Sequence, residues 1–434
     1  MDTAPRIRTL ALVAALAAGA SGPAGASTFS FGAGAVLPGS AQVLPGTRYS
    51  AALGYGFEDG PAVTSVDRGG PDPARAHFCT SDRPFLFSVA VPGGNYEVAV
   101  VLGDLAGEST TTIKSELRRL EVEEQHTLLG QFAVRRFVVN VRTPAFPSGA
   151  VRLKPRERTG ETRDWDDRLT LEFSGERPCV CSVSVTPAPG VPTVYLAGDS
   201  TVCDQPYEPF CSWGQMLPRF FGPGVAIANH AESGESLRSF IGENRLAKLD
   251  SLMRPGDFLF IQFGHNDQKE RGENVGAFTT YTADLERFVA DARAHGVTPV
   301  LVTSVSRRSF GDDGKLSNSL GDYPEAVRRV AREQGVALVD LNEMTRVLYE
   351  ALGPEKAKAL FPFVHDRTEG THHNNYGAYE IAKCVVQAIR VERLALAGLL
   401  LGDTAPFDPG HPDPPEAFVV PASLKASNEV PYGN

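Results

Sequence analysis

Four short polar motifs in the second half of the chain combine hydroxyl, imidazole, carboxylate and amide side chains. They are Gly198-Asp199-Ser200-Thr201, Asn229 through Gly234, Gly264-His265-Asn266-Asp267 and Glu369-Gly370-Thr371-His372. A serine hydroxyl is a weak nucleophile at neutral pH, and it needs a base within hydrogen-bond reach. Histidine suits that role because its pKa lies near neutrality. These residue types predict acyl transfer, with Ser200 as the nucleophile and His372 as the base and then the acid.

Two kinds of supporting group are also present. A carboxylate can bond the other ring nitrogen of the histidine and fix its tautomer, and Glu369 stands three residues before His372. The oxyanion of a tetrahedral intermediate needs hydrogen-bond donors, each worth about 3–4 kcal/mol of barrier. The candidate donors are the backbone N–H groups of Ser200 and Gly234 and the side-chain amide of Asn266.

Four further residues are assigned to substrate binding: Asp199, Arg238, His265 and Trp213. The indole of Trp213 offers a face for a sugar ring, although this residue also fits the buried start of a helix. Each motif alone has an ordinary explanation, since Asn and Asp cap helices and glycines form turns. The motifs indicate a shared active site only when their positions relative to the predicted strands are considered.

Five apolar segments predict the strands of a parallel sheet, and they alternate with amphipathic helical patterns. They are residues 193–197, 225–229, 258–263, 299–303 and 337–340. The first three polar motifs directly follow the first three strands, and the fourth precedes the last helix. Because ligands on such sheets bind at the carboxyl ends of the strands, we expect all four motifs to meet at one edge.

The chain before this sheet has a different character. Residues 28–186 contain short alternating runs, including 96–101, 137–141, 169–173 and 180–185, between Gly, Pro, Asp and Asn turns. This pattern predicts an antiparallel β-sandwich. A Pro-rich linker at 187–192 then leads into the α/β segment. We therefore expect a β-sandwich at 27–189, an α/β domain at 190–401 and a Pro-rich C-terminal extension at 402–434.

The first 26 residues predict export. Arg6 and Arg8 precede an apolar run from Leu10 to Ala20, and Ala24-Gly25-Ala26 has the small-residue pattern of a cleavage site. We expect a signal peptide that is cut after Ala26 and a secreted protein, either extracellular or periplasmic. The six cysteines fit an oxidising compartment. Cys203 and Cys211 flank a polar loop that a disulfide could close, whereas Cys384 is expected to be a buried thiol in a helix.

Composition narrows the possible partners. A net charge of −10 disfavours binding to nucleic acid through its phosphates, and no apolar run reaches the ~20 residues of a membrane span. No cysteine spacing matches a zinc site, so we expect no metal and no cofactor. A metal-dependent deacetylase stays as an alternative, with His365, Asp366, His372 and His373 as its candidate ligands.

Taken as a set, the four motifs resemble the sequence blocks of the GDSL/SGNH hydrolase superfamily. More narrowly, Asn229-x-Ala231-x-x-Gly234-x-Ser236-x-Arg238 and Thr371-His372-x-x-x-x-Gly377-Ala378 resemble the rhamnogalacturonan acetylesterases. The resemblance covers about residues 193–395 and implies a three-layer α/β/α, flavodoxin-like domain. It also implies the roles given above to Ser200, His372, Gly234 and Asn266, and a galactose-binding-like, carbohydrate-binding-module-like sandwich in front. The family usually has Asp where this chain has Glu369, so Asp366 stays open as the orienting acid.

The resemblance implies a carbohydrate esterase that removes O-acetyl groups from plant rhamnogalacturonan or pectin by a serine acyl-enzyme mechanism. We expect the secreted protein to be a monomer. Four basic residues on loops at the expected active edge could hold uronate carboxylates: Arg238, Lys269, Arg307 and Arg308. Three alternatives stay open. They are a lipid or small-ester hydrolase of the same superfamily, an acetyl-xylan esterase, and a glycan-binding protein whose α/β domain is inert.

Overall fold

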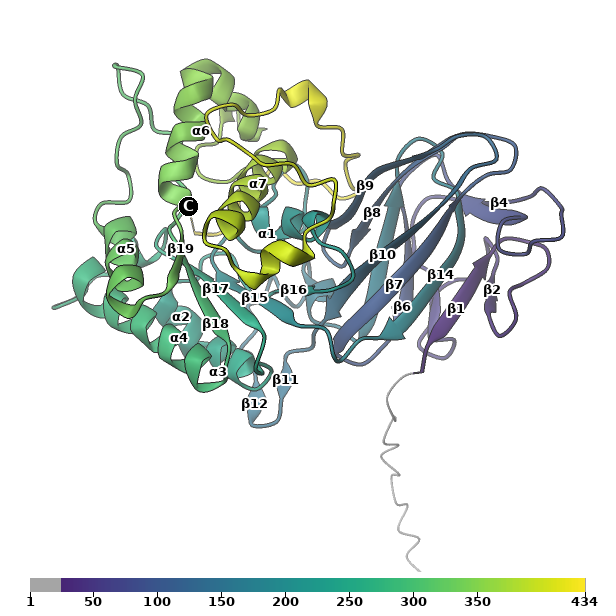
Figure 1. Cartoon of the computed structure of the whole chain (residues 1–434), viewed down its shortest axis with the longest axis horizontal. Coiled ribbons are helices and arrows are strands. Elements are labelled where there is room, and N and C mark those ends of the chain that lie inside the picture. The colour runs from purple at the N-terminus through teal and green to yellow at the C-terminus, as the bar shows by residue number, and fades with distance from the viewer. Residues whose placement is uncertain (1–24, 434) are drawn as a thin grey trace, which may run out of the picture.

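The structure, a computed structural model, describes residues 25–433. All but the last two residues of the expected signal peptide therefore lie outside the described part of the chain. Figure 1 shows the long strands of the N-terminal half on one side and the helices, gathered around a second group of strands, on the other. Within residues 25–433 we find no helix with the length and apolar character to cross a membrane.

The N-terminal half is a β-sandwich, as the alternating pattern predicts. One layer has five strands in the order β3 (Tyr55–Phe57), β6 (Phe85–Ala90), β13 (Arg168–Ser174), β8 (Ser109–Ser115) and β9 (Arg119–Thr127). The facing layer runs β10 (Phe132–Val141), β7 (Gly94–Gly103), β14 (Val180–Pro187), β1 (Ser27–Phe31) and β2 (Ala41–Val43), with β4 (Thr64–Asp67) and β5 (His77–Thr80) beside it. Phe31, Phe87 and Leu171 are among the buried side chains that fill the space between the layers.

The C-terminal half contains the predicted parallel sheet. Its strands are β15 (Thr193–Gly198), β16 (Ala226–Asn229), β17 (Phe258–Gln262), β18 (Thr298–Val302) and β19 (Ala337–Val339), in the order β19-β18-β17-β15-β16. Every neighbouring pair is parallel. The helices are α1 (Trp213–Met216), α2 (Leu237–Gly242), α3 (Arg245–Asp250), α4 (Thr282–Ala294), α5 (Tyr323–Gln334), α6 (Leu341–Lys356) and α7 (Asn375–Val391).

Alternate residues of the central strand point to opposite faces of this sheet. Val194 and Leu196 of β15 pack with α1, α6 and α7, whereas Tyr195 and Ala197 pack with α2 through α5. A strand that is covered on both faces by helices must be apolar at every position, which explains the continuous apolar runs. The three-layer α/β/α expectation is confirmed.

The two halves share one sheet, which the sequence did not reveal. Val139 of β10 pairs in parallel with Ile227 of β16, so a single 12-stranded sheet runs from the α/β half into the sandwich. The C-terminal extension also returns to the sandwich. The Lys114 ammonium on β8 donates to the carbonyl of Pro421 at 2.7 Å, and Ser423 donates to the Glu172 carboxylate of β13 at 2.7 Å.

All six cysteines lie in the described part of the chain, and all are free, buried thiols. The suggested Cys203–Cys211 disulfide is therefore wrong. The Cys203 sulfur contacts the Ser233 hydroxyl at 3.3 Å, while the Cys211 sulfur faces the carbonyl of Ser212 at 3.7 Å. The loop between them is held instead by ion pairs described below. Cys384 is fully buried in α7, as expected.

Candidate active site

The structure brings Ser200 and His372 together although they lie 172 positions apart in the chain. Ser200 follows the carboxyl end of β15, and His372 precedes α7. The Ser200 Oγ and the His372 Nε2 are 2.9 Å apart, which is hydrogen-bond distance for a nucleophile and its base. Both side chains are almost fully buried, with 2% exposure each.

Glu369, rather than Asp366, lies against the histidine ring. Its Oε1 is 3.4 Å from His372 Nδ1, and its Oε2 accepts the backbone N–H groups of Thr371 and His372. The extra methylene, compared with aspartate, is accommodated because the carboxylate folds back onto its own loop. Asp366 is exposed at the turn between β20 (Phe363–Val364) and β21 (Arg367–Thr368). The geometry therefore favours Glu369 as the acid that orients the ring.

The Glu369 carboxyl has a pKa lowered from 4.5 to about 2. Burial alone would raise this pKa, but the hydrogen bond and charge of His372 and the two backbone donors outweigh it. Because the folded-state pKa lies below the unfolded-state value, the ionised group stabilises the fold above about pH 4.5 and loses that contribution as the pH falls toward 2. We expect acidification from about pH 5 to 3 to lower the melting temperature of the wild type more than that of Glu369→Gln. Equal losses in calorimetry would contradict the lowered pKa.

The candidate oxyanion donors lie beside the nucleophile loop. Gly234 adopts a left-handed conformation with φ +79°, which glycine tolerates without strain. The Asn266 amide donates to the carbonyl of Glu235 at 2.9 Å, which places it next to Gly234. Gln205 Nε2 and Ser212 Oγ hold the carbonyl of Ser200 at 2.8 and 2.7 Å. These bonds fix the backbone of the nucleophile before substrate binds.

The C-terminal end of the chain covers two of these donors. The Tyr432 ring packs on Gly234, and Gly433 lies so close that a Cβ there would come within 2.8 Å of Asn266 Oδ1 and 2.9 Å of Gly234 Cα. The Lys269 ammonium donates to the carbonyl of Gly433. The sequence motifs gave no sign of this contact, because it comes from residues far along the chain.

Deleting residues 430–434 is expected to raise kcat/KM on acetyl esters several-fold, since Tyr432 and Gly433 occupy the space above Gly234 and Asn266. Initial rates of the full-length and shortened proteins on the same esters measure this effect. Substitution of Val419 by Ser is a control in the same extension, because Val419 is exposed and does not line the hollow beside Gly234. A loss of activity on deletion would show that the segment shapes the substrate site rather than obstructing it.

The four residues assigned to substrate binding have different positions. Trp213 begins α1 in the core with 1% exposure, and its Nε1 donates to Gln262 Oε1 at 2.9 Å, so its assignment to a sugar ring is wrong. Asp199 is fully buried, and its Oδ1 accepts from the backbone and hydroxyl of Thr201. Its carboxylate shapes the turn and does not reach a substrate.

His265 is also buried, and burial followed by the positive charge of Arg307 lowers its pKa well below 6.5. It therefore stays neutral and does not face solvent. Arg238 is exposed near Glu270, with 3.7 Å between its Nη1 and the carboxylate. Among the other basic candidates, Lys269 adjoins Asn266, with 3.4 Å between Nζ and Oδ1.

Arg307 and Arg308 hold the loop of the catalytic histidine. Arg307 donates to the Thr371 hydroxyl at 3.3 Å, and Arg308 donates to the carbonyl of Thr368 at 3.3 Å. These bonds use part of each guanidinium to fix the loop that carries Glu369 and His372. The expectation that the two arginines hold uronate carboxylates stays a prediction.

The suggested metal ligands do not converge. His365 and Asp366 are exposed at the hairpin, whereas His373 is buried against the Tyr349 hydroxyl, 2.6 Å from its Nε2. Within residues 25–433, one trio of acidic side chains has carboxylates close enough for a shared ion: Glu157, Glu161 and Glu232.

This trio lies among cations that compensate its charge. Arg156 donates to Glu232, and Arg245 donates to Glu157 at 2.6 Å. Burial and the neighbouring Glu232 carboxylate raise the pKa of Glu161 to about 9, so this side chain is protonated at neutral pH. The trio is therefore explained by charge compensation and proton sharing.

The sandwich holds the loop that follows the nucleophile, a role that sequence reasoning missed. Arg119 of β9 binds the Asp204 carboxylate at 2.6 Å, and the neighbouring Arg118 binds Glu208 at 2.7 Å. Arg118 Nη1 also donates to the carbonyl of Phe210 at 2.9 Å. The Phe210 ring meets His372 edge-on, with 6.2 Å between the ring centroids. The first half of the chain thus positions part of the active site.

Comparison with known proteins places this geometry in a family. Residues 196–378 match the model of the GDSL-like Lipase/Acylhydrolase family. The rhamnogalacturonan acetylesterase RhgT of Bacillus subtilis (strain 168) is 44% identical over 207 residues, which cover 45% of this chain and 88% of that protein. The probable rhamnogalacturonan acetylesterase YesY of the same organism is 35% identical over 202 residues, covering 45% of this chain and 92% of that protein.

A longer match includes the sandwich. The uncharacterized esterase YxiM of Bacillus subtilis (strain 168) is 27% identical over 379 residues, covering 85% of this chain and 91% of that protein. With a serine and a histidine in hydrogen-bond contact at the carboxyl edge of the sheet, the chain is a serine ester hydrolase. It belongs to the GDSL-like lipase/acylhydrolase family and is homologous to the rhamnogalacturonan acetylesterases.

Proposed function

We propose that this protein is a secreted carbohydrate esterase that removes O-acetyl groups from rhamnogalacturonan in plant cell-wall pectin. The 44% identity to a rhamnogalacturonan acetylesterase over most of that protein's length carries the proposal. The polar lining of the hollow beside the candidate oxyanion donor Gly234 also supports it, because this lining includes Asn266, Lys269 and Ser236. Residues 1–26 support export, because they contain two arginines, then an apolar run and then a small-residue cleavage pattern.

The mechanism has two halves. His372 Nε2 takes the proton of Ser200 as Oγ attacks the acetyl carbonyl, and Glu369 stabilises the imidazolium that forms. The oxyanion is held by the N–H groups of Ser200 and Gly234 and by the Asn266 amide. The imidazolium then protonates the sugar oxygen as it leaves, and an acetyl-serine stays on Ser200. A water activated by His372 attacks this ester and releases acetate.

The Asn266 amide and the C-terminal segment must adjust for this reaction. Asn266 Nδ2 donates to the carbonyl of Glu235, so it has one further hydrogen available for the oxyanion. Gly433 occupies the space beside Asn266 and Gly234, so the acetyl group enters when the end of the chain moves aside.

Acetate release across a panel of substrates tests the proposal. We expect the purified protein to release acetate from acetylated rhamnogalacturonan at least about tenfold faster than from acetyl-xylan, and to release no long-chain acid from lipid esters. Coupled enzymatic assay of free acetate measures the first two rates. Preference for acetyl-xylan would support a neutral substrate, and release of fatty acid would support the lipase alternative. Carbohydrate binding without acetate release would indicate an inert α/β domain.

A further inference from the structure

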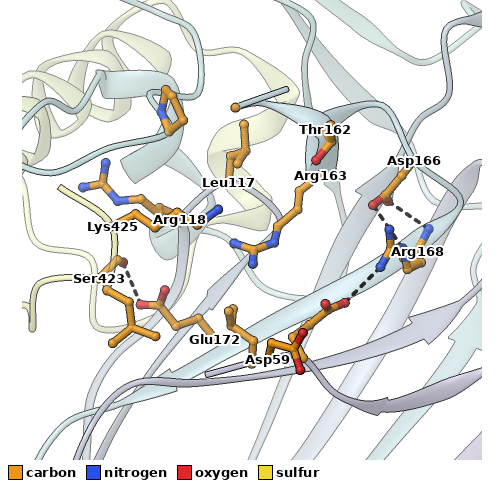
Figure 2. Close-up of a pocket in the computed structure, with 15 residues that line it drawn as sticks. Asp59, Leu117, Arg118, Thr162, Arg163, Asp166, Arg168, Glu172, Ser423 and Lys425 are labelled. Atoms are coloured by element: carbon orange, nitrogen blue, oxygen red, sulfur yellow. Dashed lines mark hydrogen bonds and ion pairs between the residues drawn. The ribbon is translucent and has the colours of Figure 1, made fainter. Parts of the chain in front are cut away.

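A charged cavity of about 180 Å³ lies where the sandwich meets the C-terminal extension. Figure 2 shows its lining, which comes from the sandwich, the 160–168 loop, Pro206 of the loop after the nucleophile and residues 423–425. A cavity of this size suits a single small polar group such as one sugar unit. Neither the sequence motifs nor the catalytic geometry accounts for it.

Most charged side chains that line the cavity have partners within the protein. Arg168 pairs with Glu58 and Asp166 at 3.1 and 3.3 Å. Arg118 pairs with Glu208, which lies outside the cavity, at 2.7 Å. Glu172 accepts from the Ser423 hydroxyl and lies 3.4 Å from the Lys114 ammonium. These contacts form the wall of the cavity.

Two cations that line the cavity differ from these side chains in their ion pairing. Arg163 and Lys425 reach into it from opposite sides (Figure 2), and no ion pair links either side chain to a carboxylate of residues 25–433, although Lys425 is exposed and Glu58 acts on it from a longer distance. Burial and the like charge of Arg163 lower the pKa of Lys425, while Glu58 only partly opposes this effect. Two cations that face one cavity, with no ion-pair partner among the described residues, can attract an anionic ligand even though carboxylates also line the cavity. The remaining acid, Asp59, is exposed at the rim and can accept bonds from sugar hydroxyls.

The cavity is linked to the active site through a second hollow. This hollow shares Gly160 and Pro206 with the cavity, and also contains Phe210 and Ser233. Phe210 contacts the His372 ring. The second hollow in turn shares Val430, Pro431 and Tyr432 with the hollow that contains Gly234 and Asn266. Through these shared lining residues the three hollows form a row of neighbours from the one beside the oxyanion donors to the charged cavity, and residues 430–432, which must move for the acetyl group to enter, line two of them.

We propose that the charged cavity is a distal subsite for a uronate unit of the polysaccharide, whose carboxylate lies between Arg163 and Lys425. The proposal rests on the proposed function, since it places the acetylated unit at Ser200 and a neighbouring part of the same chain in the row of hollows. A guanidinium binds a carboxylate through two parallel hydrogen bonds, which orients the sugar as well as attracting it. The sandwich and the C-terminal extension would therefore contribute directly to substrate selection.

Kinetics of charge-removing variants test the subsite. We expect Arg163→Gln with Lys425→Gln to raise KM for acetylated rhamnogalacturonan oligosaccharides about tenfold and to leave kcat unchanged. Hydrolysis of p-nitrophenyl acetate should not change, because that ester does not reach the cavity. Added salt should raise KM in the wild type and have little effect in the double variant. Arg135→Gln, which removes an exposed arginine of β10 that does not line the cavity, is the matched control and should behave as the wild type.

Direct binding separates this proposal from the proposed function. Calorimetry with a deacetylated rhamnogalacturonan oligosaccharide should show binding to the wild type and about tenfold weaker binding to the double variant. Equal binding by the two proteins, or an equal KM for the acetylated oligosaccharides, would overturn the subsite and leave the esterase proposal intact. If the wild type releases no acetate from the acetylated oligosaccharides, the proposed function fails. The calorimetric comparison with the deacetylated oligosaccharide still decides whether the cavity binds a uronate.

Discussion

Replacement of Ser200 by alanine is expected to lower kcat on acetyl esters by at least about 10⁴-fold. The Ser200 Oγ is the atom within 2.9 Å of the base, so its removal leaves no group that can form the acetyl-enzyme. Initial rates on p-nitrophenyl acetate and on acetylated rhamnogalacturonan measure the loss. A serine-directed phosphonate should add its mass to Ser200 in the wild type and should leave the variant unlabelled.

The Ser200 substitution should not affect folding, because it removes one buried hydroxyl whose partner is the side chain of His372. Circular dichroism and melting temperature should therefore match the wild type. Ser317→Ala, at an exposed serine of a surface loop, is the control and should keep full activity. Wild-type turnover by Ser200→Ala, or phosphonate labelling at a different residue, would refute the assignment of the nucleophile.

Replacement of Glu369 by alanine has the second largest expected effect, a fall in kcat of about 10³–10⁴-fold. The carboxylate lies 3.4 Å from His372 Nδ1 and holds the backbone N–H groups of Thr371 and His372. Without it, the ring loses its orientation and the imidazolium loses its stabilising charge. Rates measured well below the melting temperature separate this effect from the loss of stability that three unsatisfied donors would cause.

Asp366→Ala is the matched comparison, since it removes the other acid that the sequence offered. We expect it to keep activity within about twofold of the wild type, because Asp366 is exposed at the hairpin turn. Glu369→Gln, which keeps the shape and removes the charge, should be nearly as impaired as Glu369→Ala in kcat but more stable. If Glu369→Ala kept the kcat of the wild type while Asp366→Ala lost most of it, the assignment would be reversed. The loop would then need a different conformation during catalysis.

The sequence predicted the elements that depend on local pattern. Continuous apolar segments marked β15 through β19 to within about a residue at each end, because a strand covered on both faces leaves little choice of residue type. Since the carboxyl ends of parallel strands meet at one edge, the positions of Ser200 and Asn266 after two of these strands predicted that they would lie near each other. The motif spacing also indicated Glu369, although the reach of its longer side chain could not be judged without the loop geometry.

Non-local contacts were decided only by the tertiary structure. The suggested Cys203–Cys211 bridge was plausible from spacing, but Arg118 and Arg119, about ninety positions earlier, hold that loop instead. From the sequence, Trp213 fits either a surface that stacks on a sugar ring or a residue of the core. Its hydrogen bond to the buried Gln262 places it in the core. The pairing of Val139 with Ile227, which joins the two halves in one sheet, leaves no periodic signal in either segment.

By itself, the sequence determined the fold class, the edge of the sheet that carries the chemistry, and the serine and histidine that meet there. Only the tertiary structure placed Gly433 over Asn266 and brought Arg163 and Lys425 to one cavity with no ion-pair partner in residues 25–433. The physical reason is that periodicity and motif spacing report the environment of neighbouring residues. Contacts between the C-terminal extension, the sandwich and the nucleophile loop depend on how complete surfaces pack, which no local pattern records.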